Sequence, residues 1–300
     1  MDTKLVSGLR TGKVLLIGRP NVGKSTFVNN LIGQKVAITS PKPQTTRFPI
    51  RALYEDKRGQ IVFVDTPGIM EKTEDHMSQK INKKTYEVIN EEVDLVLYFI
   101  DPTRKRDFEE AKVLGMVRKI NRPKILVINK MEDADAPYLP QYKFLEDEFN
   151  DVYYISALFK KHMKPLLDKI FEFMPEQDLS KKIIIEEINA SGYPLLNLDS
   201  KTFISELIRE KVFLMMGEEI PYTTTVIVDQ IAERKNGITY IKARILTTGD
   251  RYKAMLIGRA GRKIKEIGSY ARKEIALAIN KKVFLDLNVE TDPHWQETYY

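Results

Sequence analysis

The residues most suited to chemistry form a glycine-rich run near the start of the chain. Residues 18–25 read GRPNVGKS, which matches GxxxxGK[ST], and they lie between the apolar stretch VLLI and the helical stretch FVNNLIG. Glycines at this spacing let backbone N–H groups curl around phosphates, while Lys24 reaches the β- and γ-phosphates and the Ser25 hydroxyl ligates Mg²⁺. The run therefore predicts a nucleoside-triphosphate site. Its expected contacts are Gly18, Asn21, Val22, Gly23, Lys24, Ser25 and Thr26.

Two further motifs supply groups for the metal and the terminal phosphate. DTPG at 65–68 follows the apolar run IVFV, so Asp65 can hold Mg²⁺ through water and the Gly68 N–H can meet the γ-phosphate. The second motif is TTR at 45–47, which lies between the phosphate loop and DTPG. Its Thr46 hydroxyl can complete the Mg²⁺ shell only when the γ-phosphate is present. In this order and spacing the motifs are typical of a switch-type NTPase. We predict Mg²⁺ ligands at Ser25, Thr46 and Asp65, and catalytic roles for Lys24, Thr46 and Gly68.

A third group of residues is placed to read the base. Residues 129–132 read NKME after the run KILVI, where guanine-binding proteins carry NKxD. Glu132 replaces the expected aspartate, and Asp133 could substitute for it through a register shift. A carboxylate still favours guanine, because adenine presents an acceptor at N1. The predicted base-site residues are Asn129, Lys130 and Glu132, together with Ser156, Ala157 and Leu158 of a short SAL loop.

Two positions bear on hydrolysis itself. Many GTPases place a glutamine after the DTPG glycine to orient the attacking water, whereas this chain has Ile69, which cannot position water. We therefore expect slow intrinsic hydrolysis that relies on another element. Asn21 resembles the asparagine by which potassium-dependent relatives bind a monovalent cation, so K⁺ is expected beside Mg²⁺.

A second, separate motif lies in the C-terminal third of the chain. Residues 256–268 read LIGRAGRKIKEIG, which resembles the IGxxGxxIKxIG core of KH domains, where a GxxG loop joins two helices and passes close to about four unpaired nucleotides. Residues 242–273 carry ten basic and two acidic side chains, the charge expected of a polyanion-binding face. The predicted RNA contacts are Ile257, Gly258, Arg259, Ala260, Gly261, Arg262, Lys263 and Lys265.

The elements that must position these residues follow from the apolar pattern. From residue 14 to about 175, short apolar runs alternate with amphipathic segments, which predicts a doubly wound, mostly parallel α/β sheet with its ligand crevice at the carboxyl ends of the strands. After a stretch rich in Pro, Ser, Gly and charges, the order becomes α-β-β-α-α-β, the α+β arrangement of a type II KH domain. We predict a GTPase domain at 1–176, a linker at 177–198 and a KH domain at 199–300.

Composition narrows the remaining function classes. The chain has no cysteine, which excludes disulfides and thiolate metal sites, and its three histidines have no metal-ligand spacing. Its apolar runs are far shorter than the roughly 20 residues that span a bilayer. The net charge of +6 is mild, so the basic C-terminal stretch is a local feature.

Taken together, GRPNVGKST, TTR, DTPG, NKxE, SAL and the KH core resemble the Era-type GTPases, from about residue 13 to 295. The resemblance implies GTP hydrolysis to GDP, binding near the 3′ end of 16S ribosomal RNA, and a role in maturation of the 30S subunit. It places that role in bacteria or an organelle, and we expect a monomer in the bacterial cytoplasm. Two alternatives stay open: an RNA-binding module that senses GTP but barely hydrolyses it, and a switch with weak peripheral membrane association.

Overall fold

The computed structural model describes residues 9–42, 45–68, 76–132, 136–176, 199–217, 219–235 and 237–299. It divides the chain into two compact units. The first comprises Met1–Ala37 and Thr46–Asn197, and the second comprises Ile38–Thr45 and Leu198–Tyr300. The predicted linker, residues 177–198, lies outside the described residues.

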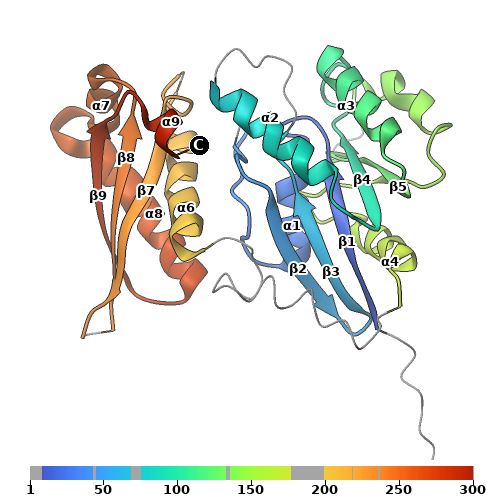
Figure 1. Cartoon of the computed structure of the whole chain (residues 1–300), viewed down its shortest axis with the longest axis horizontal. Coiled ribbons are helices and arrows are strands. Elements are labelled where there is room, and N and C mark those ends of the chain that lie inside the picture. Colours follow the sequence, from blue (N-terminus) through green and yellow to red (C-terminus); the bar gives the residue numbers. More distant parts are fainter. Residues whose placement is uncertain are drawn as a thin grey trace, which may run out of the picture. The chain divides into compact units, whose positions relative to one another are not determined.

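A six-stranded sheet forms the centre of the first unit (Figure 1). Its strands lie in the order β2-β3-β1-β4-β5-β6, and β2 pairs antiparallel with β3 while the other neighbours pair in parallel. Parallel strands joined by crossover helices confirm the predicted doubly wound fold. The elements are β1 (Arg10–Ile17), α1 (Lys24–Ile32), β2 (Ile50–Asp56), β3 (Gly59–Asp65), α2 (His76–Ile89), β4 (Leu95–Ile100), α3 (Phe108–Lys119), β5 (Lys124–Ile128), the 3-10 helix η1 (Leu139–Leu145), β6 (Val152–Tyr154) and α4 (Met163–Phe173).

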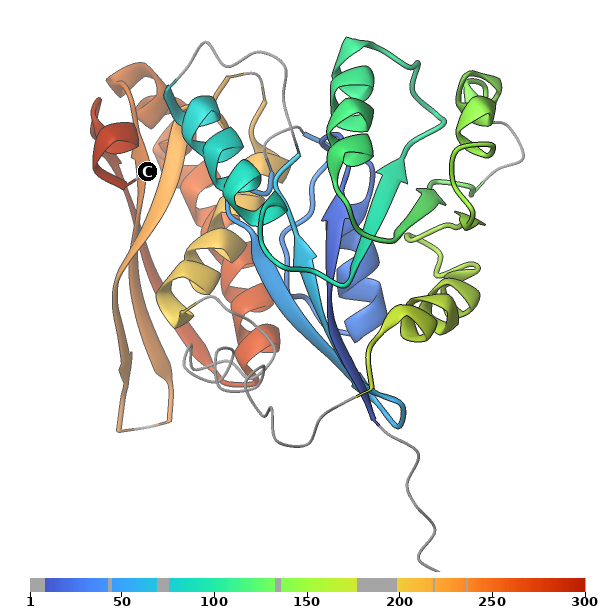
Figure 2. The ribbon, with the colours of Figure 1, turned by 45° about the vertical axis from the view of Figure 1, so that its right-hand side comes forward.

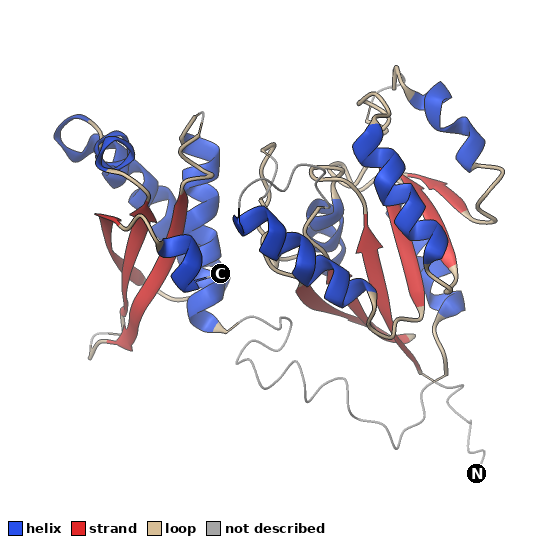
Figure 3. Cartoon of the chain, turned by 45° about the horizontal axis from the view of Figure 1, so that its top comes forward, coloured by secondary structure: helices blue, strands red, loops and turns tan. Residues whose placement is uncertain are grey.

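Helices cover both faces of this sheet (Figure 3). On one face, α2, α3 and η1 contribute to a buried cluster that includes Leu15 and Leu126. On the other face, Phe27 of α1 packs edge-on against Phe63 and Phe99, with ring centroids 6.0 and 5.3 Å away. Because water reaches neither face, strands such as β4 are continuous apolar runs with every residue buried.

The structure adds one strand that the sequence pattern did not predict. β2 pairs with β3 from Ile50 opposite Asp65 to Asp56 opposite Gly59. It lies at the edge of the sheet, and its residues IRALYED mix charged and apolar side chains instead of forming a run. Such a mixed segment carries a weak strand signal, because an edge strand needs only part of its surface to be apolar.

The second unit is a three-stranded sheet with α6 and α8 packed against it (Figure 2). β7 and β8 are antiparallel, whereas β8 and β9 are parallel and are joined through α7 and α8. This order confirms the predicted α-β-β-α-α-β topology. The elements are α6 (Ser200–Met215), β7 (Thr224–Glu233), β8 (Thr239–Thr247), α7 (Asp250–Ile257), the 3-10 turn η2 (Arg259–Gly261), α8 (Arg262–Ile279), β9 (Val283–Thr291) and the short helix α9 (Trp295–Tyr299).

Helix α6 organises the interior of this unit through buried charges. Asp199 caps its N-terminus by accepting from the backbone N–H of Lys201 and Thr202. Further along, Glu210 Oε1 accepts from the backbone N–H of Thr39 at 2.8 Å, and Arg209 donates to the Thr45 carbonyl. These bonds explain why the segment Ile38–Thr45 clusters with the second unit.

Among the described residues, no helix is long and apolar enough to cross a membrane.

Candidate nucleotide site and RNA-binding loop

The phosphate loop between β1 and α1 holds two residues in left-handed backbone conformations, Asn21 at φ 64° and Gly23 at φ 99°. A side chain at Gly23 would be excluded by contact as well, since an added Cβ would lie 2.1 Å from Asn129 Nδ2. Gly23 also precedes α1, whose first N–H groups receive no side-chain cap in the described part of the chain. The loop thus places backbone N–H groups at a helix N-terminus, the arrangement that binds phosphate.

Lys24 supplies the positive charge of this loop. Its side chain is buried, and Nζ donates to the carbonyls of Gly18 and Arg19 at 3.1 and 3.2 Å. Burial lowers the pKa of the ammonium, and the carboxylate of Asp65 opposes that shift. The ammonium is therefore held inside the curl of the loop, where a phosphate oxygen can replace a carbonyl as its partner.

Three oxygen-bearing side chains from separate segments meet beside Lys24. Ser25 Oγ donates to Asp65 Oδ2 at 2.5 Å and lies 3.2 Å from Thr46 Oγ1. The other oxygen, Asp65 Oδ1, is buried and has no hydrogen-bond partner among the described residues. Burial raises the pKa of Asp65, while Lys24 and Ser25 lower it in part. A carboxylate oxygen that lacks a donor, next to two hydroxyls, suits a hard cation such as Mg²⁺.

The DTPG segment approaches the phosphate loop closely. A Cβ added at Gly68 would lie 2.4 Å from the backbone nitrogen of Pro20, so only glycine fits there. Thr66 is tied to β1, because its hydroxyl donates to the Leu16 carbonyl at 2.8 Å. Ile69, the residue expected to leave water unplaced, lies outside the described residues.

The predicted base-reading residues fall into two groups. Asn129 is buried, and its side chain joins two other loops: Nδ2 donates to the Val22 carbonyl at 2.8 Å, and Oδ1 accepts from the Ala157 N–H at 2.9 Å. Lys130, at φ 64°, pairs with Asp101 at 2.6 Å. Asn129 and Lys130 therefore brace the site in addition to any contact with a base.

Glu132 differs from these two residues. It is half-buried, and within the described ranges its carboxylate makes no hydrogen bond or ion pair. Ser156 is buried and Leu158 is 61% exposed, so the SAL loop turns outward within two residues. Asp133, the alternative acceptor, lies outside the described residues.

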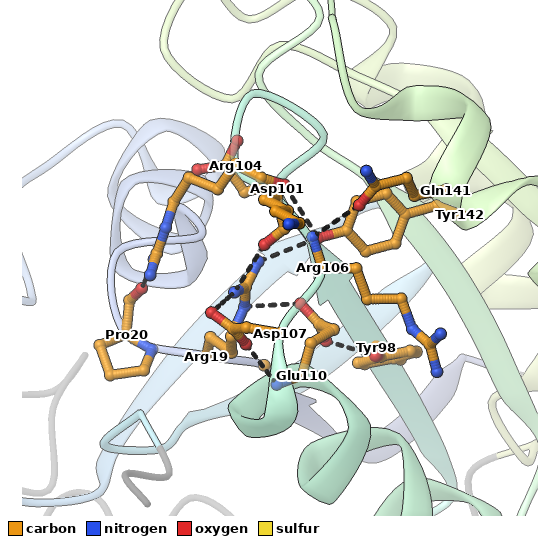
Figure 4. A network of polar contacts seen from close by, with 12 residues as sticks. Arg19, Pro20, Tyr98, Asp101, Arg104, Arg106, Asp107, Glu110, Gln141 and Tyr142 are labelled. Atoms are coloured by element: carbon orange, nitrogen blue, oxygen red, sulfur yellow. Dashed lines mark hydrogen bonds and ion pairs between the residues drawn. The ribbon is translucent and has the colours of Figure 1, made fainter.

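A polar network that no sequence motif indicated surrounds Arg19 (Figure 4). Arg19 is fully buried, and its guanidinium pairs with Glu110 and Asp107, both at 2.7 Å. The sequence held one signal of it. The buried face of α3 runs Glu110, Val113, Leu114, Val117, so a carboxylate takes the first place in an apolar stripe.

The GxxG loop of the second unit is open, unlike the phosphate loop. Gly258 and Gly261 have φ of 70° and 74°, and Ala260 between them has φ 51°. A Cβ at Gly258 would lie 2.7 Å from Cβ of Lys263. The cations along the loop differ in their environment, because Arg259, Arg262 and Lys265 are exposed whereas Lys263 pairs with Glu266 at 3.1 Å.

These features define a class of protein: a P-loop GTPase domain followed by a KH domain. Comparison with known families agrees, since the family described as 50S ribosome-binding GTPase matches residues 13–130 and the KH domain family matches residues 219–296. The chain is 37% identical over 292 residues to GTPase Era of Halothermothrix orenii, covering 96% of this chain and 95% of that one. It is 36% identical over 293 residues to GTPase Era of Thermotoga maritima, covering 96% and 94%. The chain belongs to the GTPase Era family, and it is a GTPase.

Two solved structures are similar over almost the whole chain. An Era variant of Aquifex aeolicus bound to GDP and AlF₄⁻ matches with a TM-score of 0.85 and 29% identity, over 97% of each chain. A structure of Era with MgGDPNP and nucleotides 1506–1542 of 16S ribosomal RNA matches with a TM-score of 0.86 and 30% identity, over 97% of this chain and 96% of that one.

Proposed function

We propose that this protein is a GTP-dependent switch that binds 16S ribosomal RNA near its 3′ end and assists assembly and maturation of the 30S subunit. One observation carries the proposal. A similar structure, aligned over almost the entire chain, contains both a GTP analogue with magnesium and a segment of 16S ribosomal RNA. A phosphate site alone would not specify RNA, and a KH loop alone would not specify hydrolysis.

The nucleotide would be GTP or GDP with Mg²⁺. Ser25, Thr46 and Asp65 would hold the metal, whose charge neutralises the β- and γ-phosphate oxygens when it is bound. Lys24 would place its ammonium against those phosphates, and the Gly68 N–H would donate to the γ-phosphate. Thr46 Oγ1 already lies 3.2 Å from Ser25 Oγ, and a bound γ-phosphate would favour this position of Thr46, so hydrolysis would remove that support. The proposed contacts are Gly18, Asn21, Val22, Gly23, Lys24, Ser25, Thr26, Asp65, Gly68, Asn129, Lys130, Glu132, Ser156, Ala157 and Leu158.

Guanine selection would depend mainly on Glu132. Its carboxylate makes no bond in the described part of the chain, so it can accept from the N1–H and amino groups of guanine. Asn129 contributes by holding the loops around Val22 and Ala157 in register. Asn21, already in a left-handed conformation within the phosphate loop, would bind K⁺ beside the phosphates.

RNA would pass along the open GxxG loop. Exposed Arg259, Arg262 and Lys265 would contact backbone phosphates, and Ile257 would line the groove for bases. Gly258, Ala260, Gly261 and Lys263 complete the proposed set. The domain limits remain those proposed from the sequence: GTPase at 1–176, linker at 177–198 and KH domain at 199–300. We also propose a cytoplasmic monomer, and liposome flotation would test for peripheral membrane binding.

Crosslinking in ribosomal RNA tests the proposal directly. The protein with GTP should crosslink to unpaired nucleotides near the 3′ end of 16S ribosomal RNA. The variant Lys24→Ala, which should bind GTP poorly, should crosslink poorly. The control is 23S ribosomal RNA, which offers the same phosphates without that segment. Equal crosslinking to both RNAs would contradict the proposed specificity. Phosphate release with and without 16S ribosomal RNA then decides between a hydrolysing switch and a sensor that barely turns over.

A further inference from the structure

Arg19 is part of the phosphate loop, yet its side chain is used elsewhere (Figure 4). The guanidinium is fully buried and is contacted from three directions. Nε lies 2.7 Å from Glu110 Oε2, Nη1 lies 2.7 Å from Asp107 Oδ2, and Nη2 donates to the Tyr142 hydroxyl at 3.0 Å. These partners come from the start of α3 and from η1, not from the loop itself.

The partners of Arg19 are themselves fixed. Tyr98 of β4 donates its hydroxyl to Glu110 Oε1 at 2.5 Å, and the Glu110 backbone N–H donates to Asp107 Oδ1 at 3.0 Å. The Tyr142 hydroxyl donates to the Arg104 carbonyl at 3.1 Å. The partners of Arg19 are therefore connected to one another by hydrogen bonds that do not involve Arg19.

Pro20, the next residue of the loop, is also bound by a side chain from outside the loop. Arg104 Nη1 donates to the Pro20 carbonyl at 3.0 Å, and Asn129 Nδ2 donates to the Val22 carbonyl. Carbonyls on either side of Asn21 are therefore both bound by side chains from other loops. Asn21 itself has φ 64°, a left-handed conformation that asparagine adopts more readily than most L-residues, and the two contacts beside it fix this part of the loop.

Burial makes the charges of Arg19 and Glu110 depend on each other. A buried guanidinium without a carboxylate would be very unfavourable, and Glu110 is as inaccessible as Arg19. Burial raises the pKa of Glu110, and Arg19 opposes that shift. For Arg19, burial alone would lower the pKa, but Glu110 and Asp107 raise it on balance. Each charge thus stabilises the other against the effect of burial.

We propose that Arg104, Asp107, Glu110 and Tyr142 form a clamp that fixes the phosphate loop through Arg19 and Pro20. In the clamp, Arg19 and Glu110 are positioning residues for nucleotide binding: they hold the loop N–H groups in their phosphate-binding arrangement before GTP arrives. A loop that is already ordered loses less conformational entropy upon binding, so the clamp raises affinity without touching the nucleotide.

The decisive test removes both charges together. Glu110→Gln alone would leave Arg19 buried and unpaired and could unfold the protein, so the informative variant is Arg19→Met with Glu110→Gln. If the pair only stabilises the fold, this uncharged pair should restore both the melting temperature and GDP affinity. If it is a clamp, the melting temperature should recover while affinity for GDP and GTP falls about tenfold. KM for GTP should rise more than kcat falls, because the loop contacts the phosphates already in the ground state.

The control is an ion pair that joins Arg118 of α3 to Glu148, which follows η1. Arg118→Met with Glu148→Gln makes the same change at an ion pair that is partly exposed, and GDP affinity should stay at the parent value. Should the Arg19–Glu110 double variant fail to fold, Arg104→Ala and Tyr142→Phe take its place. Arg104→Ala removes the hydrogen bond to the Pro20 carbonyl, and Tyr142→Phe removes those to Arg19 Nη2 and the Arg104 carbonyl without changing a charge. Each should weaken GDP binding a few-fold. Parent-like GDP affinity in the folded double variant, or in both of these single variants, would overturn the proposal.

Discussion

The two glycine loops of this protein meet the same backbone problem in different surroundings. Gly23 before α1 and Gly261 before α8 both adopt left-handed conformations, with φ of 99° and 74°. A Cβ at Gly23 would collide with Asn129, whereas one at Gly261 would meet no described atom within 4 Å. The phosphate loop is therefore closely surrounded at Gly23, whereas the GxxG loop has open space at Gly261. Steric exclusion therefore adds to the conformational requirement at Gly23 and at Gly258, whereas at Gly261 only the conformation favours glycine.

Their charges differ in the same way. Arg19 and Lys24 are buried and bonded, so their positions are set before any ligand binds. Arg259 and Arg262 are exposed and solvated. Interactions at the first loop should depend on geometry and little on salt, whereas those at the second should depend strongly on salt.

The sharpest test of this contrast is alanine at the two glycines. Gly23→Ala should lower GDP affinity by at least about 100-fold, because the loop must move away from Asn129. Gly261→Ala should cost only about 1–2 kcal/mol of stability from the left-handed conformation, with RNA binding largely kept. Calorimetric titration with GDP and anisotropy titration with a short unpaired RNA measure the two effects. Lys24→Ala is the positive control, and its nucleotide binding or turnover should be lost.

Acidic side chains in the open loop should remove RNA binding selectively. Gly258→Asp with Gly261→Asp places two carboxylates where phosphates would pass, so affinity for a short unpaired RNA should fall below detection. Nucleotide affinity should equal that of the parent, because the change lies in the other unit. The Gly258→Ala, Gly261→Ala pair separates charge from backbone strain. If the aspartate variant binds RNA as tightly as the parent, residues 256–268 do not form the RNA site.

A smaller effect is expected at the base site. Glu132→Asp shortens the arm that carries the carboxylate, and it should tighten GDP binding several-fold while ATP stays weak. Glu132→Gln is the matched control of similar size, and it should weaken GDP because it introduces an amide donor facing the guanine donors. Calorimetry with GDP, GTP and ATP measures this. Equal affinity of the parent for ATP and GTP would show that Glu132 does not read guanine.

The smallest expected effect is a change in salt dependence. Lys265→Ala should weaken binding to all unpaired RNAs alike and reduce the slope of log affinity against log salt by about 0.7, as for one lost phosphate contact. Lys119→Ala, an exposed lysine of α3, changes net charge equally and should leave the slope unchanged. Lys263→Ala should have less effect than Lys265→Ala, because Lys263 is already paired with Glu266. Identical slopes for all three variants would argue against phosphate contacts at this loop.

Local sequence patterns were enough to predict the features that depend on residues close together in the chain. Apolar runs followed by glycine motifs predicted the doubly wound sheet and the segments that bring Ser25, Thr46 and Asp65 together. The spacing of helices and strands around GRAG predicted the KH topology, which the structure confirms. These features could be predicted because each relies on periodicity or on a motif contained within a few residues.

Other features depend on partners that are distant in the chain, and only the tertiary structure decided them. Edge strand β2 has no apolar run of its own and exists because β3 offers hydrogen bonds to it. The hydrogen bonds of the Asn129 side chain to the backbone of Val22 and Ala157 could not be predicted, because the NKxD motif indicates only contacts with the base. The pairing of Arg19 with Glu110 joins residues 91 positions apart. Neither local sequence identifies the other residue as its partner. A buried charge becomes tolerable only when folding brings the opposite charge beside it.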